Sequence, residues 1–334
     1  MAAERIALVK LSALGDVVHA LPVATALRAA KPASRVAWIV ERREAALLRG
    51  HPALDAVIEV DTRAWRRARG PAAALTALRA LLALRRRLRA ERFDVALDLQ
   101  GLLKSAVISA ATGASTRIGF GPGWSRERAS GLFTTLKVSP PPDAVHVVDQ
   151  YLSLLEPLGI RRPAVTFALP ADERAEALME RALAAAGLKP RDRLVVINPG
   201  AGRPAKRWPV DRFRDLARRL ARDQGAAVLV VWGPSEHEAA RTIAGDGVTL
   251  APPTDLHELI AVLRRASVVV AGDTGPLHLA AALGVPCVGL YGPTSARRSG
   301  PYGAGHRTLQ SADGTMTAID TTAVGEAVAA LLAA

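Results

Sequence analysis

Short apolar runs alternate along this chain with longer segments whose apolar residues recur at helical spacing. In the first half, the runs at 5–10, 36–40, 57–60 and 95–99 predict buried strands. The segments between them predict helices at 17–30, 70–92 and 102–111. Strands separated by helices are typical of βαβ units, which build a parallel sheet.

A second series of the same kind follows the proline-rich run 139–142 and two predicted helices at 146–158 and 171–188. It predicts strands at 194–197, 227–232, 268–271 and 287–290, and helices at 209–222, 236–244, 255–265, 277–283 and 321–332. We therefore predict an α/β protein of GT-B-like form, with two Rossmann-like domains that face a central cleft. The predicted domains are residues 1–165 and 166–320, and the helix in 321–334 could pack back on the first domain.

Composition and charge narrow the classes of function. The 334 residues are enough for two domains, and a net charge of +13 favours anionic partners such as a phosphorylated substrate, a membrane face or nucleic acid. Arginines supply much of this positive charge, in a dense tract at 79–92 and at Arg66, Arg67 and Arg69. The alternative is that these arginines only form solvent-exposed helix faces and bind no partner. Aromatic residues are only 4% and no nucleic-acid motif is present, so we expect no nucleic-acid partner.

The amino-terminal segment and the cysteine content point to a cytoplasmic protein. Charges at Glu4, Arg5, Lys10 and Asp16 interrupt the apolar core that a signal peptide needs, and no window is long and apolar enough to cross a bilayer. Cys287 is the one cysteine, which excludes a disulfide framework. The histidines and acids show no metal-ligand spacing, so we expect neither a metal nor a cofactor.

The stretch 267–294 holds the strongest candidate binding loop. A predicted strand ends at the turn Gly272–Pro276, and a helix follows. Ligands bind at the carboxyl ends of parallel strands, where the next helix offers unpaired N–H groups to an anion. Asp273 could accept from a sugar hydroxyl, Thr274 and Gly275 could approach a phosphate, and His278 would lie one turn into the helix. A purely structural turn is the alternative.

Two further loops of the second domain have the same placement. In the segment 198–209, Gly202 and Lys206 precede a helix and would suit a pyrophosphate. In the segment 232–238, Glu236 or Glu238 could bind ribose hydroxyls, or the acids could only cap a helix. Thr254 is a weaker candidate beside the base.

In the first domain, polar side chains follow two predicted strands. The string KLSALGD places Asp16 at the start of a helix, where it could be a cap or, being kept ionised by the helix dipole, a general base. Further candidates for an anionic acceptor are Lys10, Ser12, Gln100, Lys104 and Arg126.

These motifs together resemble those of glycosyltransferase family 9, the ADP-heptose:lipopolysaccharide heptosyltransferases. The string GDTGPLHLAAALGVP is similar to the family's carboxyl-terminal signature, and KLSALGD, DLQGLLKS and KRWP match other motifs in the same order. The amino-terminal motifs are most like those of heptosyltransferase I. The loop NPGAGR departs from that type, because it has glycines where the type I enzymes carry threonines.

The resemblance implies a metal-independent, inverting transfer of L-glycero-D-manno-heptose from ADP-heptose to an anionic Kdo–lipid A acceptor of the lipopolysaccharide inner core. It gives Asp16 the role of base and Lys206 that of a phosphate ligand that also offsets charge on the leaving group. It implies a cytoplasmic enzyme, peripheral on the inner membrane. Heptosyltransferase II or another family member, a nucleotide-sugar epimerase or hydrolase, and a non-enzymatic polyanion-binding protein remain as alternatives.

Overall fold

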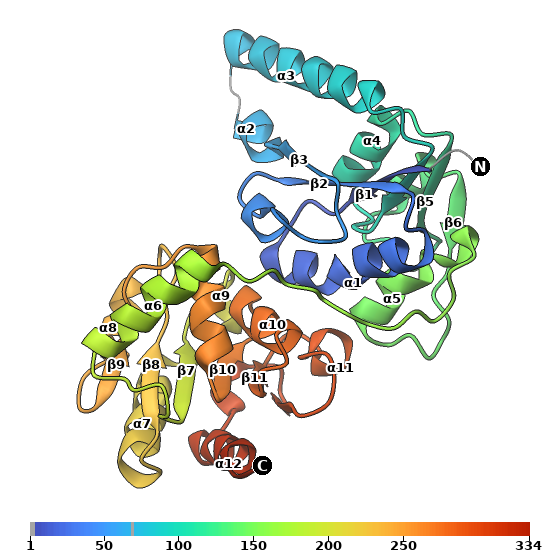
Figure 1. The fold of residues 1–334 in the computed structure, drawn as a ribbon. Helices are drawn as coiled ribbons and strands as arrows, with labels where there is room; N and C mark the ends of the chain where they lie inside the picture. The colour runs from blue at the N-terminus through green and yellow to red at the C-terminus, as the bar shows by residue number, and fades with distance from the viewer. Residues whose placement is uncertain (1–3, 68–69) are drawn as a thin grey trace. The chain divides into compact units, whose positions relative to one another are not determined.

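The computed structural model describes residues 4–67 and 70–334, and the chain forms two compact units, Met1–Pro170 and Ala171–Ala334. Each unit holds one six-stranded, fully parallel sheet with helices on both faces (Figure 1). This confirms the predicted α/β fold of two Rossmann-like units.

The first sheet has the order β3-β2-β1-β4-β5-β6. Its strands are β1 (Arg5–Val9), β2 (Arg35–Glu41), β3 (Ala56–Val60), β4 (Val95–Asp98), β5 (Thr116–Phe120) and β6 (Leu136–Val138). Its helices are α1 (Leu14–Ala30), α2 (Thr62–Arg67), α3 (Pro71–Ala90), α4 (Leu103–Ala111) and α5 (Val147–Ser153), with short 3-10 turns at Ala45–Leu47, Arg128–Leu132 and Glu156–Leu158.

Helices α3 and α4 cover one face of the first sheet, and α1 and α5 pack together on the other (Figure 1). The core beneath α3 and α4 contains Val9, Ile39 and Ile58 from the strands and Leu84 and Leu88 from α3. The central strands are buried on both sides, which explains their unbroken apolar sequence.

The second sheet has the order β12-β11-β10-β7-β8-β9. Its strands are β7 (Leu194–Asn198), β8 (Ala227–Val230), β9 (Val248–Leu250), β10 (Val268–Gly272), β11 (Cys287–Tyr291) and β12 (Arg307–Gln310). Its helices are α6 (Glu173–Ala185), α7 (Val210–Asp223), α8 (His237–Ile243), α9 (Leu256–Arg265), α10 (Gly275–Ala282), α11 (Ala296–Ser299) and α12 (Thr321–Ala333), with 3-10 turns at Pro204–Lys206 and Met316–Ala318.

The segment before α6 belongs to the first unit. The Thr25 hydroxyl donates to the Thr166 carbonyl at 2.6 Å, and a ring nitrogen of His51 lies 3.2 Å from the Phe167 carbonyl oxygen. These bonds hold the extended passage 163–170 against α1 and the turn near His51. The structural division therefore falls at Pro170/Ala171, whereas the sequence prediction placed it at 165/166.

The closing helix α12 packs on α7, β10 and β11 of the second unit. Its residues Val324 and Val328 are fully buried in the core of that unit. These buried apolar side chains complete the core of the helix's own unit.

Candidate functional site

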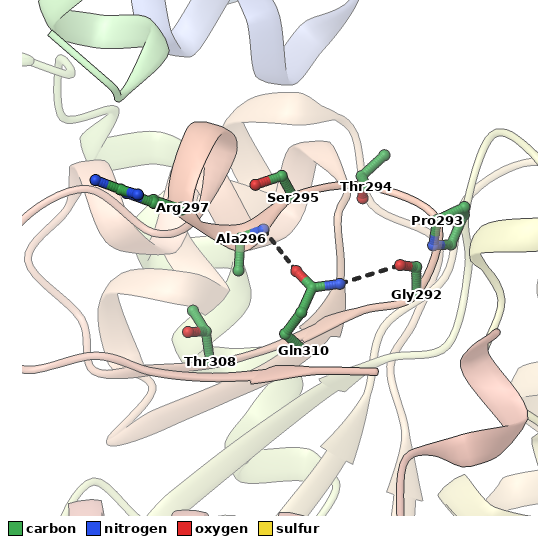
Figure 2. Close-up of a pocket in the computed structure, with 8 residues that line it drawn as sticks. All are labelled: Gly292, Pro293, Thr294, Ser295, Ala296, Arg297, Thr308 and Gln310. Carbon is green, nitrogen blue, oxygen red and sulfur yellow. Dashed lines mark hydrogen bonds between the residues drawn. The ribbon is translucent and has the colours of Figure 1, made fainter. Parts of the chain in front are cut away.

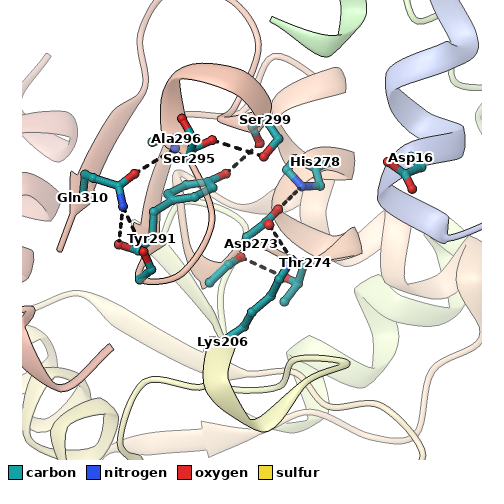
Figure 3. A network of polar contacts seen from close by, with 12 residues as sticks. Asp16, Lys206, Asp273, Thr274, His278, Tyr291, Ser295, Ala296, Ser299 and Gln310 are labelled. Carbon is teal, nitrogen blue, oxygen red and sulfur yellow. Dashed lines mark hydrogen bonds and ion pairs between the residues drawn. The ribbon is translucent and has the colours of Figure 1, made fainter. Parts of the chain in front are cut away.

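The carboxyl end of β10 holds a compact cluster of charged side chains (Figure 3). The Nζ atom of Lys206 lies 2.6 Å from Oδ2 of Asp273, and the Nε2 atom of His278 lies 3.0 Å from Oδ1 of the same carboxylate. Lys206 ends a 3-10 turn that follows β7, whereas Asp273 follows the neighbouring strand β10. The parallel pairing of these strands brings the two loops together.

The Asp273 carboxyl is held as an anion. Burial by itself would raise its pKa, but the hydrogen bonds and charges of His278 and Lys206 hold that pKa well below its usual range. Beside it, burial and then the negative charge of Asp273 raise the pKa of Tyr291, whose hydroxyl donates to the Ser299 carbonyl at 2.9 Å. Tyr291 therefore stays neutral and supports the cluster from within.

Thr274 is the N-cap residue of α10, and Gly275 is its first helical residue. The Nδ2 atom of Asn198, at the end of β7, donates to the Thr274 hydroxyl at 3.2 Å, and that hydroxyl donates to the Gly272 carbonyl at 3.1 Å. No side chain caps this helix, so the N–H groups of Gly275 and Leu277 in its first turn can donate to an anionic ligand. Sequence reasoning missed Asn198, although its place between a strand and a glycine-bearing loop was a signal.

Glu236 faces the loop after β7. Its Oε2 atom accepts a hydrogen bond from the Gly233 N–H at 2.9 Å, and the carboxylate lies against Gly200. Glu238, in the first turn of α8, is exposed to solvent. The structure therefore turns Glu236, and not Glu238, towards the loop that carries Gly202 and Lys206.

Thr254 lies in the loop after β9, at the neighbouring strand end. The indole N–H of Trp232, after β8, donates to the Ala251 carbonyl in this loop at 2.9 Å. The loops after β7, β8, β9 and β10 thus lie at the carboxyl ends of neighbouring strands of the second sheet, and all predicted nucleotide-sugar residues are in these loops or in the first turn of α10.

In the first unit, Asp16 and Arg126 form an ion pair. Asp16 is in the first turn of α1, and its Oδ1 atom lies 3.4 Å from an Arg126 guanidinium nitrogen. The N-cap residue of α1 is Ala13, so Asp16 is not the helix cap that the sequence left open. Its side chain is 23% exposed, which leaves it open to a ligand.

Arg126 is held in place through its neighbour in the chain. Glu127 donates its N–H to the Gly101 carbonyl at 3.0 Å, and its carboxylate accepts from the Leu103 N–H at 2.6 Å. The loops after β4 and β5 are therefore tied together beside the start of α1.

Two predicted acceptor ligands are buried beneath these loops. Lys10 is fully buried, and its ammonium donates to the Leu99 carbonyl at 3.1 Å and the Tyr151 hydroxyl at 2.6 Å. Gln100 is 4% exposed and accepts from the Leu11 N–H at 2.8 Å. Through these bonds the Lys10 ammonium and the Gln100 side-chain oxygen hold the strand ends together from inside the fold, whereas their predicted role was to bind the acceptor.

The other two predicted acceptor residues stay near the surface. Lys104 lies 4.0 Å from Glu41 at the end of β2, and Ser12 is half-buried just before α1. Glu41 also accepts from the Thr62 hydroxyl. The carboxyl ends of the first sheet's strands thus also carry charged side chains, and Asp16, Arg126 and Lys104 are among those that solvent reaches.

Comparison with known proteins places the chain in a family. Residues 81–326 match Glycosyltransferase family 9 (heptosyltransferase). The chain belongs to glycosyltransferase family 9. It is 30% identical to lipopolysaccharide heptosyltransferase 1 of Escherichia coli over 331 residues, which are 98% of this chain and 100% of that protein.

Solved structures of a family 9 enzyme have the same fold. The E. coli heptosyltransferase WaaC with ADP is 29% identical, with a TM-score of 0.81, and the match covers 98% of this chain and 99% of that chain. The WaaC structure with ADP-2-deoxy-2-fluoro heptose is 28% identical, with a TM-score of 0.79 and the same coverage. The chain is thus a glycosyltransferase enzyme of GT-B fold, and the non-enzymatic polyanion-binding alternative is set aside.

This family 9 enzyme has a further opening on the same edge of the second sheet (Figure 2). The cavity, of about 620 Å³, lies after β11 and is lined by Gly292, Pro293, Thr294, Ser295, Ala296, Arg297, Thr308 and Gln310. The Gln310 side chain accepts from the Ala296 N–H at 2.9 Å and donates to the Gly292 carbonyl at 3.1 Å. Gln310 therefore fixes the loop that forms the cavity.

Residues 4–67 and 70–334 are the part of the chain that the structure describes. No group of three or more His, Cys, Asp or Glu side chains in this described part could hold a metal ion. None of its helices is both long and apolar enough to cross a membrane. Arg69 and the side chains of Arg66 and Arg67, which the sequence placed in a basic tract, lie outside the described residues.

Proposed function

We propose that this enzyme transfers L-glycero-D-manno-heptose from ADP-heptose to the Kdo region of the lipopolysaccharide inner core. One observation carries the proposal: Lys206 and Asp273 meet at the start of α10, on an edge with Thr274, Gly275 and Glu236. The similarity to a heptosyltransferase solved with ADP and with an ADP-heptose analogue supports this assignment of the donor.

The donor would bind the second unit. The pyrophosphate would lie against the Lys206 ammonium, the backbone of Gly202 and the N–H groups at the start of α10, because these supply positive charge and unpaired donors. Glu236 would accept from the ribose hydroxyls, and Thr254 would flank the adenine. Asp273 and His278 would orient Lys206 and meet the sugar.

Asp16 would act as the general base. It would take the proton of an acceptor hydroxyl while that oxygen attacks the anomeric carbon from the face opposite ADP, and the bond from that carbon to the ADP oxygen would break with inversion. Arg126, 44% exposed beside Asp16, would meet an anionic acceptor, together with Lys104 and Ser12. A base of this kind contributes roughly 10²–10⁴-fold to the rate.

Lys206 would take over the task that a divalent metal performs in other transferases. As ADP departs, negative charge develops on its terminal phosphate, and a cation already fixed by Asp273 stabilises this charge without reorganisation. The proposed reaction is therefore metal-independent and needs no cofactor.

The acceptor class also implies where the enzyme works. A Kdo–lipid A acceptor is anchored in a membrane leaflet, so we propose a cytoplasmic enzyme that associates peripherally with the inner membrane. A net charge of +13 would favour an anionic membrane surface.

Heptosyltransferase II, or another family 9 enzyme with a different donor or acceptor, is the second candidate. The specific observation in its favour is the loop at 198–203, NPGAGR, whose glycines and alanine offer no side-chain hydroxyl to the nucleotide.

Calorimetric titration with a panel of ADP- and UDP-sugars, followed by product analysis on Kdo–lipid A, tests the proposal. We expect ADP-heptose to bind best among the panel and the product to carry one added heptose with inverted anomeric configuration. Preference for a UDP-sugar would overturn the donor. Transfer only to an acceptor that already carries heptose would favour the second candidate, and sugar release or epimerisation without acceptor would favour a hydrolase or epimerase.

A further inference from the structure

The outer side of α3 carries a stripe of exposed leucines. Leu75, Leu78 and Leu82 are 48%, 51% and 43% exposed. Because they are spaced three and four residues apart, they lie on one face of the helix. The opposite face holds Leu84 and Leu88, which are buried in the core of the first unit. The helix thus has apolar side chains on two sides, and only the side with Leu84 and Leu88 packs against the core of the first unit.

Such a stripe indicates an interaction surface, because soluble proteins rarely expose several large apolar side chains next to one another. In the described part of the second unit, only Leu178 on α6 is exposed to a similar degree. An isolated exposed leucine is ordinary on a protein surface, whereas three leucines in helical register are not.

The charges on α3 identify the partner. The helix contains five arginines, Arg79, Arg85, Arg86, Arg87 and Arg89, and no acidic residue. All five are exposed. A surface that combines leucines with unopposed cations is complementary to a layer that is apolar inside and anionic outside. It is unfavourable to a second copy of the same helix, since pairing would bring like charges together.

We propose that α3 is an in-plane membrane anchor: Leu75, Leu78 and Leu82 insert among the acyl chains of an anionic leaflet while the arginines contact lipid phosphates. Helices with one apolar stripe and a polar face rich in arginine lie in the interface at a depth of about 5–10 Å. The charges exclude a spanning orientation for this helix.

This anchor would bring the unit that carries Asp16 to the surface that holds a lipid-linked acceptor. The inference rests on the proposed function only for the lipid-linked nature of the acceptor. The leucine stripe itself stands on exposure, register and charge.

Vesicle co-sedimentation tests the anchor. We compare the wild type, the triple variant Leu75→Gln/Leu78→Gln/Leu82→Gln, which keeps helix propensity, and the control Leu178→Gln, on vesicles of phosphatidylglycerol and phosphatidylcholine. The triple variant should bind at least about tenfold more weakly, because each leucine loses the burial of its side chain. The Leu178→Gln variant should bind like the wild type.

The salt dependence of vesicle binding distinguishes the contribution of the leucines from that of the arginines. At ~1 M salt the Debye length falls to about 3 Å, so binding through exposed charges fades. Wild-type protein should retain measurable binding under this condition, and the triple variant should retain none. Equal binding of the wild type and the triple variant, both at low salt and at ~1 M salt, would overturn the anchor. A wild-type dimer in sedimentation that the triple variant abolishes, without vesicle binding, would overturn it as well.

A second measurement reports insertion directly. Cys287 is fully buried, so a cysteine introduced by Leu78→Cys is the accessible thiol for an environment-sensitive dye. We expect a blue shift of its emission on anionic vesicles and no shift for a dye at Leu178→Cys. An unshifted spectrum at position 78 in a vesicle-bound sample would show that the stripe does not insert.

Failure of the anchor and failure of the proposed function are distinguishable. With a soluble, deacylated acceptor, the triple variant should keep the kcat and KM of the wild type. If the wild type itself transfers no heptose to any acceptor, the proposed function fails, and the vesicle and dye measurements still decide whether α3 binds membranes.

Discussion

The carboxylate of Glu236 occupies the space in which a side chain on residue 200 would lie. A Cβ atom added to Gly200 would overlap the Glu236 carboxyl group, which the Gly233 N–H holds from its other side. Gly200 is therefore needed for the orientation of Glu236, whatever its backbone conformation.

The substitution Gly200→Ala should displace Glu236 and weaken ADP binding. The loss of a hydrogen bond to a charged group is worth about 1.5–3 kcal/mol, which corresponds to roughly a 10- to 150-fold increase in the Kd measured by calorimetry. Gly325→Ala in α12 is the control, because its Cβ would make only an ordinary 3.8 Å contact with Leu216. Unchanged ADP affinity in Gly200→Ala would place the nucleotide away from Glu236.

Asp16→Asn should reduce turnover by roughly 10²–10⁴-fold and leave the affinity for ADP nearly unchanged, because it removes a base but keeps the shape. The matched control is Asp211→Asn, which removes a first-turn carboxylate from α7. Steady-state rates with acceptor and calorimetry with ADP give the two readouts. Near-normal turnover in Asp16→Asn would refute the assignment of the base.

Lys206→Ala and Asp273→Ala should each weaken ADP binding by about 1.5–3 kcal/mol, the first by loss of a phosphate partner and the second by release of Lys206. Lys189→Ala, an exposed lysine in the same unit, serves as the control. If neither substitution at the cluster changes the Kd of ADP, the pyrophosphate does not bind there.

Asp273→Asn should destabilise the protein in a pH-dependent way. The carboxyl has a depressed pKa in the folded state, so its contribution is complete above the unfolded-state pKa of about 3.9 and is lost as the pH falls through the lower folded-state value. We expect a loss of about 3 kcal/mol in the free energy of unfolding at pH 7, since the partly buried Lys206 loses its counter-ion. Urea unfolding of wild type and variant should converge as the pH is lowered below 4; a difference that grows in acid would contradict this ion pair.

Activity should survive EDTA, since Lys206 is proposed to stabilise the leaving group in place of a metal. Transfer is measured before chelation, after chelation, and again after Mg²⁺ or Mn²⁺ has been added back. Complete loss with EDTA that either ion reverses would show that a metal takes part in the reaction.

The sequence by itself determined the fold class, because central parallel strands are buried on both faces and must be apolar along their whole length. It also located the loops of the site, since glycine-bearing turns interrupt those runs at the strand ends. At the start of α9, Asp255 and Glu258 form a capping box with both of its hydrogen bonds, an arrangement that their spacing of three residues allows.

The elements that the sequence missed are mostly marginal strands. Strands β6, β9 and β12 are at sheet edges, and β5 and β12 contain polar residues such as Arg117 and Arg307. A short edge strand is held by backbone hydrogen bonds to its neighbour and needs no apolar run, so it leaves little signal in the pattern of side chains.

Only the tertiary structure decided which side chains of the motifs are accessible. Lys10 and Ser12 belong to one string, but the fold directs Lys10 into the protein to Tyr151 and leaves Ser12 near the surface. Likewise, Glu236 and Glu238 are indistinguishable by spacing, and the close approach of Gly200 selects Glu236. A local sequence fixes which residues follow a strand, whereas the contacts that bury or expose them come from segments far away in the chain.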